Sequence, residues 1–284
     1  MYQIGNLLDS FINIKSTVTY SQAFLFKFIF FCALAIKHFT EKKRGYPKVI
    51  GNGSFIYEKY ILLNKRNIFL FKIYSVTFHL RIIISLSILF LPLSSFLLQL
   101  SAFTLIISYI SEVFSLFRYH LIVILFLLFY VIIDSESLMT LTFFNKISLS
   151  ETIEFKSLLY VKALTIIILL SSARRKIQYS FFNGRMITES INFSTSEKNR
   201  LFKDHFSSLT KKILIKIILP NAKFFSFTII FLQITAALFL LIPSKITWIG
   251  CVLGIILQLG ITTLFPRTLS FFTLIMISIY ILLF

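Results

Sequence analysis

The sequence predicts an all-α protein, a polytopic membrane helix bundle with seven or eight transmembrane helices. Its mean hydropathy is +0.87, and 57% of its 284 residues are hydrophobic. Only 14% are charged, against about 25% in ordinary soluble domains. A soluble fold of this length could bury a large core, but it could not hide this much apolar surface. The composition therefore indicates lipid as the solvent.

Apolar stretches account for these helices in chain order. A helix needs about 20 mainly apolar residues to cross roughly 30 Å of hydrocarbon. Pro92 divides a run that is too long for one helix, because proline ends or breaks a helix. The first stretch carries Lys27 near its centre, so it either spans the membrane or lies at the interface. The expected spans are residues 19–36, 73–91, 95–114, 119–133, 158–172, 224–242, 246–265 and 269–284.

The charges lie in blocks between the apolar stretches. Residues 37–72 hold nine Lys/Arg and residues 173–223 hold eleven, whereas residues 134–157 are mainly acidic. Basic loops face the cytoplasm, so eight spans place both basic loops inside and the acidic loop and both termini outside. We therefore expect a multi-pass protein of a cell membrane, the bacterial inner membrane.

The same blocks account for the net charge of +18. They predict attraction to a lipid bilayer with anionic headgroups, at about 1 kcal/mol per cation near the surface. Nucleic acid is not an expected partner, because no nucleic-acid-binding module accompanies the charge.

No soluble catalytic signature is present. The sequence has no Gly-rich phosphate loop, HExxH, paired CxxC or GxSxG motif, so it leaves the cofactor unknown and indicates no metal. Cys32 and Cys251 lie within apolar stretches, where thiols behave as small hydrophobic groups and no disulfide is expected. The N-terminus lacks the arrangement of a removable signal peptide.

Two regions are expected along the chain. Residues 1–72 form an N-terminal segment with one weak span and a basic loop, and residues 73–284 form the main membrane domain. Within that domain, residues 179–223 form a basic amphipathic insertion. Ser194 lies three residues before Glu197, the spacing of a capping box, so a helix that lies on the inner leaflet is expected to begin there.

Polar residues inside the expected spans are candidates for a site, because an unpaired charge in lipid costs several kcal/mol. Arg81 lies in mid-span, with Thr77 and Ser85 four residues to either side, so the three share one helix face. Arg81 either pairs with a neighbouring helix for structural reasons or holds an anion in an internal cavity. Gln233 and Gln258 lie inside later spans.

The stretch SSARRKIQYSFFNGRMI, residues 171–187, brings three cations together directly after an apolar run. Arg174, Arg175 and Lys176 are followed by aromatic residues and an Asn-Gly turn. Cations at the end of a span usually anchor its topology. A lysine enclosed between helices would instead have a lowered pKa and could act as a base.

The same stretch resembles a motif of the HTTM family, which includes the membrane domain of vitamin K-dependent gamma-carboxylase. In that family a span ends in a pattern like A-G-x-K-K-L. Four residues further on come an aromatic residue, an intervening residue, an acidic residue and Gly. Residues 172–177 (SARRKI) and 181–184 (FFNG) are similar. The resemblance places the family's catalytic lysine on Lys176, or on Arg175 by a one-residue slip.

The C-terminal third is also similar to the family. There, a span with a Glu precedes a Pro/basic turn, a helix with Leu-His-Leu-Gly, and a last helix rich in Phe, Met and Tyr. Here Gln233 stands in place of the Glu and Gln258 in place of the His. The candidate substrate-binding residues are these two, Arg81 and Arg175. The lumenal domain of the carboxylase has no counterpart in this chain, so gamma-carboxylation itself is not expected.

Two hypotheses about function follow. In the first, an HTTM-like membrane protein modifies or matures a secreted peptide or a lipid-soluble substrate, as small bacterial members of the family do for a peptide toxin. Lys176 is then the candidate base and Arg81 the anion holder. In the second, the chain is a non-enzymatic membrane component (an immunity factor, transporter subunit or assembly partner), and its cations serve topology and packing. The expected partners besides lipid are therefore a peptide substrate or a partner membrane protein.

Overall fold

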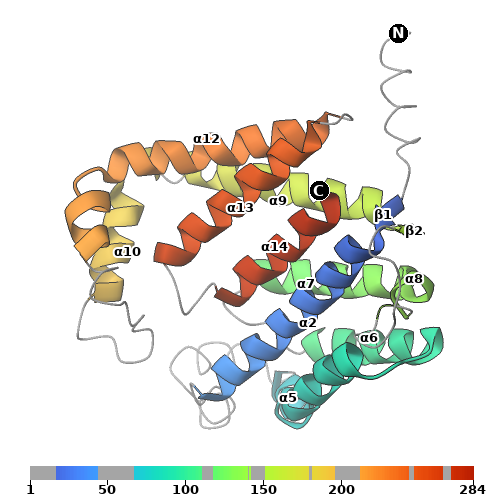
Figure 1. The fold of residues 1–284 in the computed structure, drawn as a ribbon. Coiled ribbons are helices and arrows are strands. Elements are labelled where there is room, and N and C mark those ends of the chain that lie inside the picture. The colour runs from blue at the N-terminus through green and yellow to red at the C-terminus, as the bar shows by residue number, and fades with distance from the viewer. Residues whose placement is uncertain are drawn as a thin grey trace. The chain divides into compact units, whose positions relative to one another are not determined.

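The computed structural model describes residues 17–43, 67–110, 118–139, 141, 151–178, 181–195, 212–242, 246–264 and 270–284. These residues are almost entirely helical (Figure 1), which confirms the all-α class. The chain divides into two compact units, whose described residues run over Thr17–Ser157 and over Leu158–Phe284. We call these the N-terminal unit and the C-terminal unit. The boundary follows packing, whereas the division expected at residue 72 was drawn from charge.

The described part of the N-terminal unit consists of helices and one small sheet. α2 packs against α5, and α6 packs against both α5 and α7. The predicted break at Pro92 is confirmed, because α5 ends at Phe90 and α6 begins at Ser95. The elements are β1 (Thr17–Thr19), α2 (Tyr20–Lys43), α5 (Asn67–Phe90), α6 (Ser95–Ile110), α7 (Arg118–Ile133), α8 (Ser135–Met139) and β2 (Thr152–Glu154).

The two short strands are elements that the sequence did not predict. β1 pairs antiparallel with β2, with Thr17 opposite Glu154. The backbone N–H of Tyr20 then donates to the carbonyl oxygen of Glu151 at 2.7 Å, so the pairing reaches the first residue of α2. The sheet therefore joins two segments of the N-terminal unit that lie far apart in the sequence.

Lys27 lies inside α2 and is almost completely buried. Its ammonium donates hydrogen bonds to the carbonyl oxygen of Leu138 at 3.0 Å, in the last turn of α8, and to that of Leu141 at 3.1 Å, two residues beyond the helix. The last carbonyls of a helix have no intrahelical donor, and the lysine supplies one. α2 is therefore continuous although it carries a buried charge in its first third.

The described part of the C-terminal unit is a group of packed helices. α12 packs against both α9 and α13, and α13 packs against α14. α9 is longer than the predicted helix, because it continues through the three cations to Gln178. The elements are α9 (Leu158–Gln178), η1 (Phe181–Asn183), α10 (Arg185–Thr195), η2 (Leu214–Ile218), α12 (Ala222–Leu241), α13 (Thr247–Leu264) and α14 (Ser270–Leu283).

Two glycines four residues apart let α13 approach both of its neighbours closely. A Cβ on Gly250 would lie 2.9 Å from the carbonyl oxygen of Ala236 on α12. A Cβ on Gly254 would lie 2.3 Å from the ring of Tyr280 on α14. Small residues at this spacing let helix backbones pack closely, which accounts for the position of α13 beside both helices.

The prediction that a helix begins at Ser194 was wrong, because α10 extends past Ser194 and places it in the last turn. α10 forms where Ile187 and Ile191, one turn apart, bury against Leu214. This burial outweighs the capping pattern that the sequence shows. The rest of the predicted surface helix, residues 196–211, lies outside the described residues.

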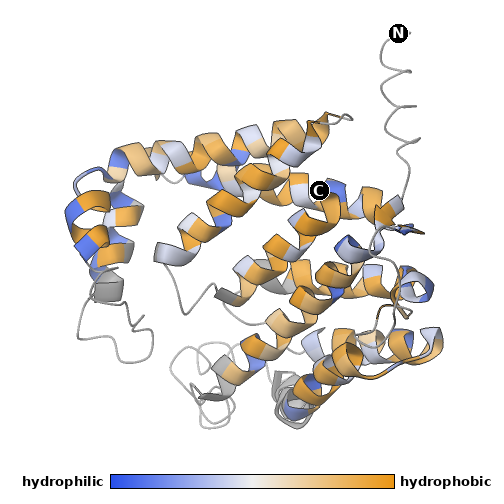
Figure 2. Ribbon diagram, viewed as in Figure 1, coloured by the Kyte–Doolittle hydropathy of each residue, from blue (hydrophilic) through white to orange (hydrophobic). Residues whose placement is uncertain are grey.

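Two of the described helices are long and apolar enough to cross a membrane, by length and composition. They are Tyr20–Phe39 of α2 and Ala222–Leu241, which is α12, each with 20 residues. Figure 2 shows that apolar residues dominate both helices and most of the others. Five more helices are apolar but have only 10–17 residues within the described ranges. By length and composition, the fold is therefore compatible with a membrane protein. The core helices of soluble proteins can have the same length and composition.

Candidate functional site

Three polar side chains meet between α9 and α12 in the C-terminal unit. Lys176 Nζ donates hydrogen bonds to Ser172 Oγ at 2.6 Å and to Gln233 Oε1 at 3.0 Å. Gln233 Nε2 donates to Ser172 Oγ at 3.0 Å, which closes a triangle. Ser172 and Lys176 are four residues apart and share one face of α9. We call these three residues the Lys176 cluster.

The partners of Lys176 are neutral. Its Nζ lies 5.9 Å from the ring centroid of Phe181, within the range of a cation–π contact, and no carboxylate among the described residues pairs with it. Lys176 lies beyond the apolar stretch of α9. Burial disfavours the ammonium, and it lowers the pKa of Lys176 to about 8. A pKa near 8 leaves roughly a tenth of the amine neutral at pH 7, able to accept a proton.

The predicted Asn-Gly turn after the cations is confirmed. Gly184 has a φ of +72°, in the left-handed region that residues with a Cβ rarely adopt. A Cβ on Gly184 would also lie 2.7 Å from the backbone nitrogen of Lys223, at the start of α12. This turn therefore fixes η1, and with it Phe181, beside the Lys176 cluster.

Among the predicted binding residues, Gln233 makes a hydrogen bond to Lys176. Arg175 is exposed on α9. Gln258 is buried in α13, where its backbone carbonyl oxygen accepts a hydrogen bond from Thr262 Oγ1 at 2.8 Å. Arg81 belongs to the N-terminal unit, so Arg81 and Lys176, the expected anion holder and the expected base, lie in different units.

Arg81 is completely buried in the N-terminal unit. Its Nε donates to Ser108 Oγ, and its Nη2 donates to the Ser108 carbonyl oxygen, on α6. The guanidinium lies over the ring of Tyr109, 4.7 Å from the centroid. Ser85 is buried as well, so it shares the inward face of α5 with Arg81, as predicted. The side chain of Thr77 lies outside the described residues.

Two further basic residues, both buried, approach the same tyrosine from α2. His38 Nε2 lies 2.7 Å from Tyr109 Oη, and Lys37 Nζ lies 5.5 Å from the ring centroid. Both residues fall in the basic loop that the sequence predicts over residues 37–72. The predicted helix ended at residue 36, whereas α2 extends to Lys43 and so carries both residues into the unit.

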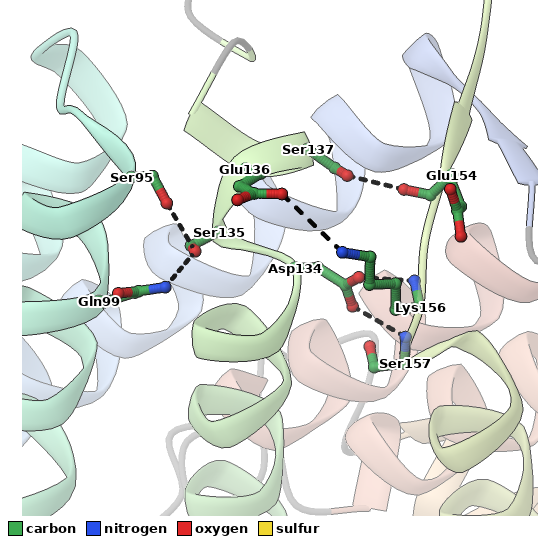
Figure 3. A network of polar contacts seen from close by, with 9 residues as sticks. All are labelled: Ser95, Gln99, Asp134, Ser135, Glu136, Ser137, Glu154, Lys156 and Ser157. Carbon is green, nitrogen blue, oxygen red and sulfur yellow. Dashed lines mark hydrogen bonds and ion pairs between the residues drawn. The ribbon is translucent and has the colours of Figure 1, made fainter.

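A third polar group, at the end of α7, is also buried (Figure 3). Asp134 accepts hydrogen bonds from the backbone N–H groups of Lys156 at 2.6 Å and Ser157 at 3.0 Å. Burial raises the pKa of Asp134, although the hydrogen bonds from Ser157 and Lys156 and the charge of Lys156 act in the opposite direction. The carboxylate thus holds the turn that precedes α9.

The residues that follow Asp134 connect α8 to its neighbours. Ser135 Oγ lies 2.9 Å from Ser95 Oγ and accepts a hydrogen bond from Gln99 Nε2 at 2.8 Å, both on α6. Ser137 Oγ donates to the carbonyl oxygen of Glu154 in β2 at 2.7 Å. Figure 3 shows these side chains pointing toward one another from separate elements, so this group is a structural junction.

Within the ranges that the structure describes, no three His, Cys, Asp or Glu side chains are grouped so that they could hold a metal ion. Among the described residues, the Lys176 cluster is the best candidate for acid–base chemistry. It holds a partly neutral amine beside two oxygen acceptors. A comparison of the chain with protein-family models, with curated proteins and with solved structures finds no match in any of the three.

Proposed function

We propose that the protein is a multi-pass integral membrane protein of a cell membrane, with seven or eight spans. Support comes from exposed apolar side chains that recur every three or four residues. On α7 these are Ile122, Phe126, Phe129 and Ile133, a spacing that places them on one side of the helix. Soluble monomers rarely expose contiguous apolar patches larger than a few hundred Å², whereas in a bilayer such a side contacts acyl chains.

The proposed topology places the basic loops in the cytoplasm of a bacterial cell, and it can be tested at Asn183. This residue is exposed in η1. An Asn183→Cys variant, made in a Cys32→Ala/Cys251→Ala background, would be treated with a membrane-impermeant thiol reagent. Labelling in inverted vesicles but not in intact cells is the expected result. Labelling from outside would reverse the orientation and place Lys176 on the outer side.

We further propose that Lys176 is the base in the modification or maturation of a secreted peptide or a lipid-soluble substrate. The observation that carries this proposal is the partly buried amine, with a pKa of about 8 and neutral partners. The neutral amine would take a proton from the substrate and become an ammonium. Ser172 Oγ and Gln233 Oε1 both accept from Nζ, so they favour that product.

The resemblance of residues 172–184 to the HTTM motif supports the same role, and we propose membership of that family on this basis. Gln233 would orient the amine. Arg175 and Gln258 are proposed to bind the substrate together with Gln233, and Arg81 is proposed to hold an anionic group of the substrate. The anionic headgroups of the bilayer are the proposed lipid partners.

A non-enzymatic membrane component is the second candidate, and the surroundings of Arg81 favour it. The guanidinium contacts Ser108 and Tyr109, an arrangement in which protein groups join α5 to α6. An immunity factor, transporter subunit or assembly partner of another membrane protein would need only such packing.

The two candidates differ in what Lys176 must do. Secreted peptides would be compared by mass spectrometry between cells with the native chain and cells with Lys176→Ala, Lys176→Arg or Arg174→Ala. A base role predicts that the secreted peptide loses its modification, seen as a change in its mass, in both Lys176 variants. Arg174 is an exposed cation on the same helix, so Arg174→Ala should leave the modification intact. An anchoring role predicts that Lys176→Arg behaves like the native chain, because arginine keeps the charge. Protein levels in the membrane provide the control.

A further inference from the structure

An exposed row of phenylalanines runs along one side of α12. Phe224, Phe227 and Phe231 are 67%, 57% and 56% exposed, and spacings of three and four residues place them on one face. The centroids of Phe227 and Phe231 are 6.2 Å apart, and Phe182 of η1 lies 6.5 Å from Phe227. These four residues, the phenylalanine row, present a continuous aromatic surface that requires an apolar partner.

The end of the unit where this row begins is positively charged. Lys212, Lys216 and Lys223 are exposed there, and Lys223 directly precedes the row. Arg185 pairs with Glu189 at 2.6 Å, so that pair adds no net charge. Glu189 is the one acidic residue in the described ranges 181–195 and 212–241, so no other acidic residue there compensates the three lysines.

The support beneath this surface is packed and fixed. Ile187 and Ile191 of α10 bury against Leu214 and Ala222, which belong to η2 and α12. Gly184 holds the preceding turn against the start of α12. The apolar side of α10 is therefore buried within the protein, unlike that of a free amphipathic helix on a membrane. The lysines and the phenylalanine row face outward there, together with Ile213, Ile215 and Ile217.

We propose that this end of the C-terminal unit is a preformed docking surface for an anionic bilayer. The lysines meet the lipid phosphates, and the phenylalanine row enters the acyl chains. Charge complementarity selects this occupant, because a bilayer boundary combines negative headgroups with adjoining hydrocarbon. Phe224 lies at the boundary, and Phe231 lies about 10 Å deeper along the helix at 1.5 Å per residue. The inference rests on the proposed membrane location and adds which residues meet the headgroups.

Tryptophan fluorescence tests the depth of the row. The single tryptophan, Trp248, would be replaced by Trp248→Phe, and Phe224→Trp or Phe231→Trp would be added. Each chain would be reconstituted in vesicles of phosphatidylcholine and phosphatidylglycerol, with bromine atoms placed near the headgroup or deep in the acyl chain. We expect the tryptophan of the Phe224→Trp chain to be quenched more by bromines near the headgroup than by deep ones. We expect the opposite order for the Phe231→Trp chain.

The native chain separates failure of this surface from failure of the membrane proposal. Quenching of Trp248 without quenching of either variant would overturn the docking surface and assign the row to a second copy or a protein partner. No quenching in any of the three chains would overturn the membrane location as well.

A second measurement tests the choice of anionic lipid. The Lys212→Gln/Lys216→Gln/Lys223→Gln variant would be purified with bound lipid from an equal mixture of phosphatidylglycerol and phosphatidylcholine. We expect the ratio of bound phosphatidylglycerol to phosphatidylcholine to fall at least about threefold relative to the native chain. Arg185→Gln/Glu189→Gln is the matched control, because it removes a pair and keeps the net charge. A ratio equal to that of the native chain in the triple variant would overturn the anionic preference.

Discussion

The ring of Tyr280 covers Gly254 so closely that a Cβ on residue 254 would lie 2.3 Å from Tyr280 Cζ. Gly254→Ala is therefore expected to force α13 and α14 apart and to lower the free energy of unfolding by about 1–3 kcal/mol. Gly260 lies on the same helix, but a Cβ there would meet nothing within 4 Å. Thermal unfolding of purified protein in detergent checks this comparison.

Gly260→Ala is the matched control for that measurement. It should leave the unfolding temperature unchanged or raise it, since alanine favours a helix by up to about 1 kcal/mol over glycine. Equal unfolding temperatures for Gly254→Ala and Gly260→Ala would contradict the close contact.

Acylation of Lys176 is expected to follow an apparent pKa of about 8, whereas lysine in model peptides has a pKa of about 10.4. Gln233→Glu places a carboxylate beside the amine, which favours the ammonium and raises the pKa. Gln233→Leu removes an acceptor without adding charge, so it should lower the pKa further. Peptide mass spectrometry after brief acylation across a pH series measures all three chains. An apparent pKa above 10 in the native chain would show that Lys176 is solvated.

Asp134→Ala removes the acceptor of two backbone N–H groups. The buried N–H of Ser157 is then left unpaired, and we expect a loss of about 1–3 kcal/mol in the free energy of unfolding. Glu136→Ala is the control. It removes a neighbouring ion pair, in which Glu136 lies 3.8 Å from Lys156 Nζ. Both partners of that pair are exposed, so its loss should change stability by less than about 1 kcal/mol. Chemical denaturation in detergent measures both variants. Equal losses of stability in Asp134→Ala and Glu136→Ala would show that Asp134 behaves as a surface carboxylate.

Asp134 also predicts a pH dependence in the acid range. Its ordinary pKa is 3.8, and burial raises the pKa in the folded state. Between these two values the folded chain binds a proton that the unfolded chain does not, so the free energy of unfolding falls as pH rises through that range. Asp134→Asn cannot ionise and should not show this fall. Stability profiles of the two chains that run parallel would contradict the raised pKa.

Lys27→Met keeps the length of the side chain but removes the donor to the carbonyl oxygens of Leu138 and Leu141. The end of α8 is expected to loosen, so a cysteine reporter introduced as Met139→Cys should react faster with a thiol reagent. Lys27→Arg keeps a donor and should restore a rate near that of the reporter in the native background. Equal reaction rates of the Met139→Cys reporter with Lys, Met and Arg at position 27 would show that Lys27 does not stabilise the end of α8.

The helices could be predicted where an apolar run ends at a clear signal. Residues 119–133 were expected as a helix, and α7 covers Arg118–Ile133, because the run leaves no polar break inside it. The end of α9 was missed because three successive cations resemble the start of a loop. Within the helix, Lys176 reaches Gln233 of α12, a tertiary contact that no local pattern contains. The β1–β2 pairing has the same origin, since it joins segments far apart in the chain.

The polar residues could be selected from the sequence, but most of their partners could not. Ser172 lies one helical turn before Lys176 and would have been found if the helix had been continued through the cations. Arg81 was found from its position in mid-span, yet the contact with Tyr109 depends on how α5 meets α6. The hydrogen bonds from Lys27 to backbone carbonyl oxygens could not be predicted, because every residue has such an oxygen and the sequence does not mark the acceptor.

The bond from Lys27 to Leu138 has a consequence for biosynthesis. Its acceptor is 111 residues further along the chain, so α2 leaves the ribosome long before the acceptor exists. A lysine at the centre of a membrane helix disfavours insertion by about 2.5–3.5 kcal/mol. In the proposed membrane protein, α2 would therefore wait at the translocon or the bilayer surface until α8 is synthesised. Among the described helices, α2 is the first to be made, yet it would be among the last to reach its final place.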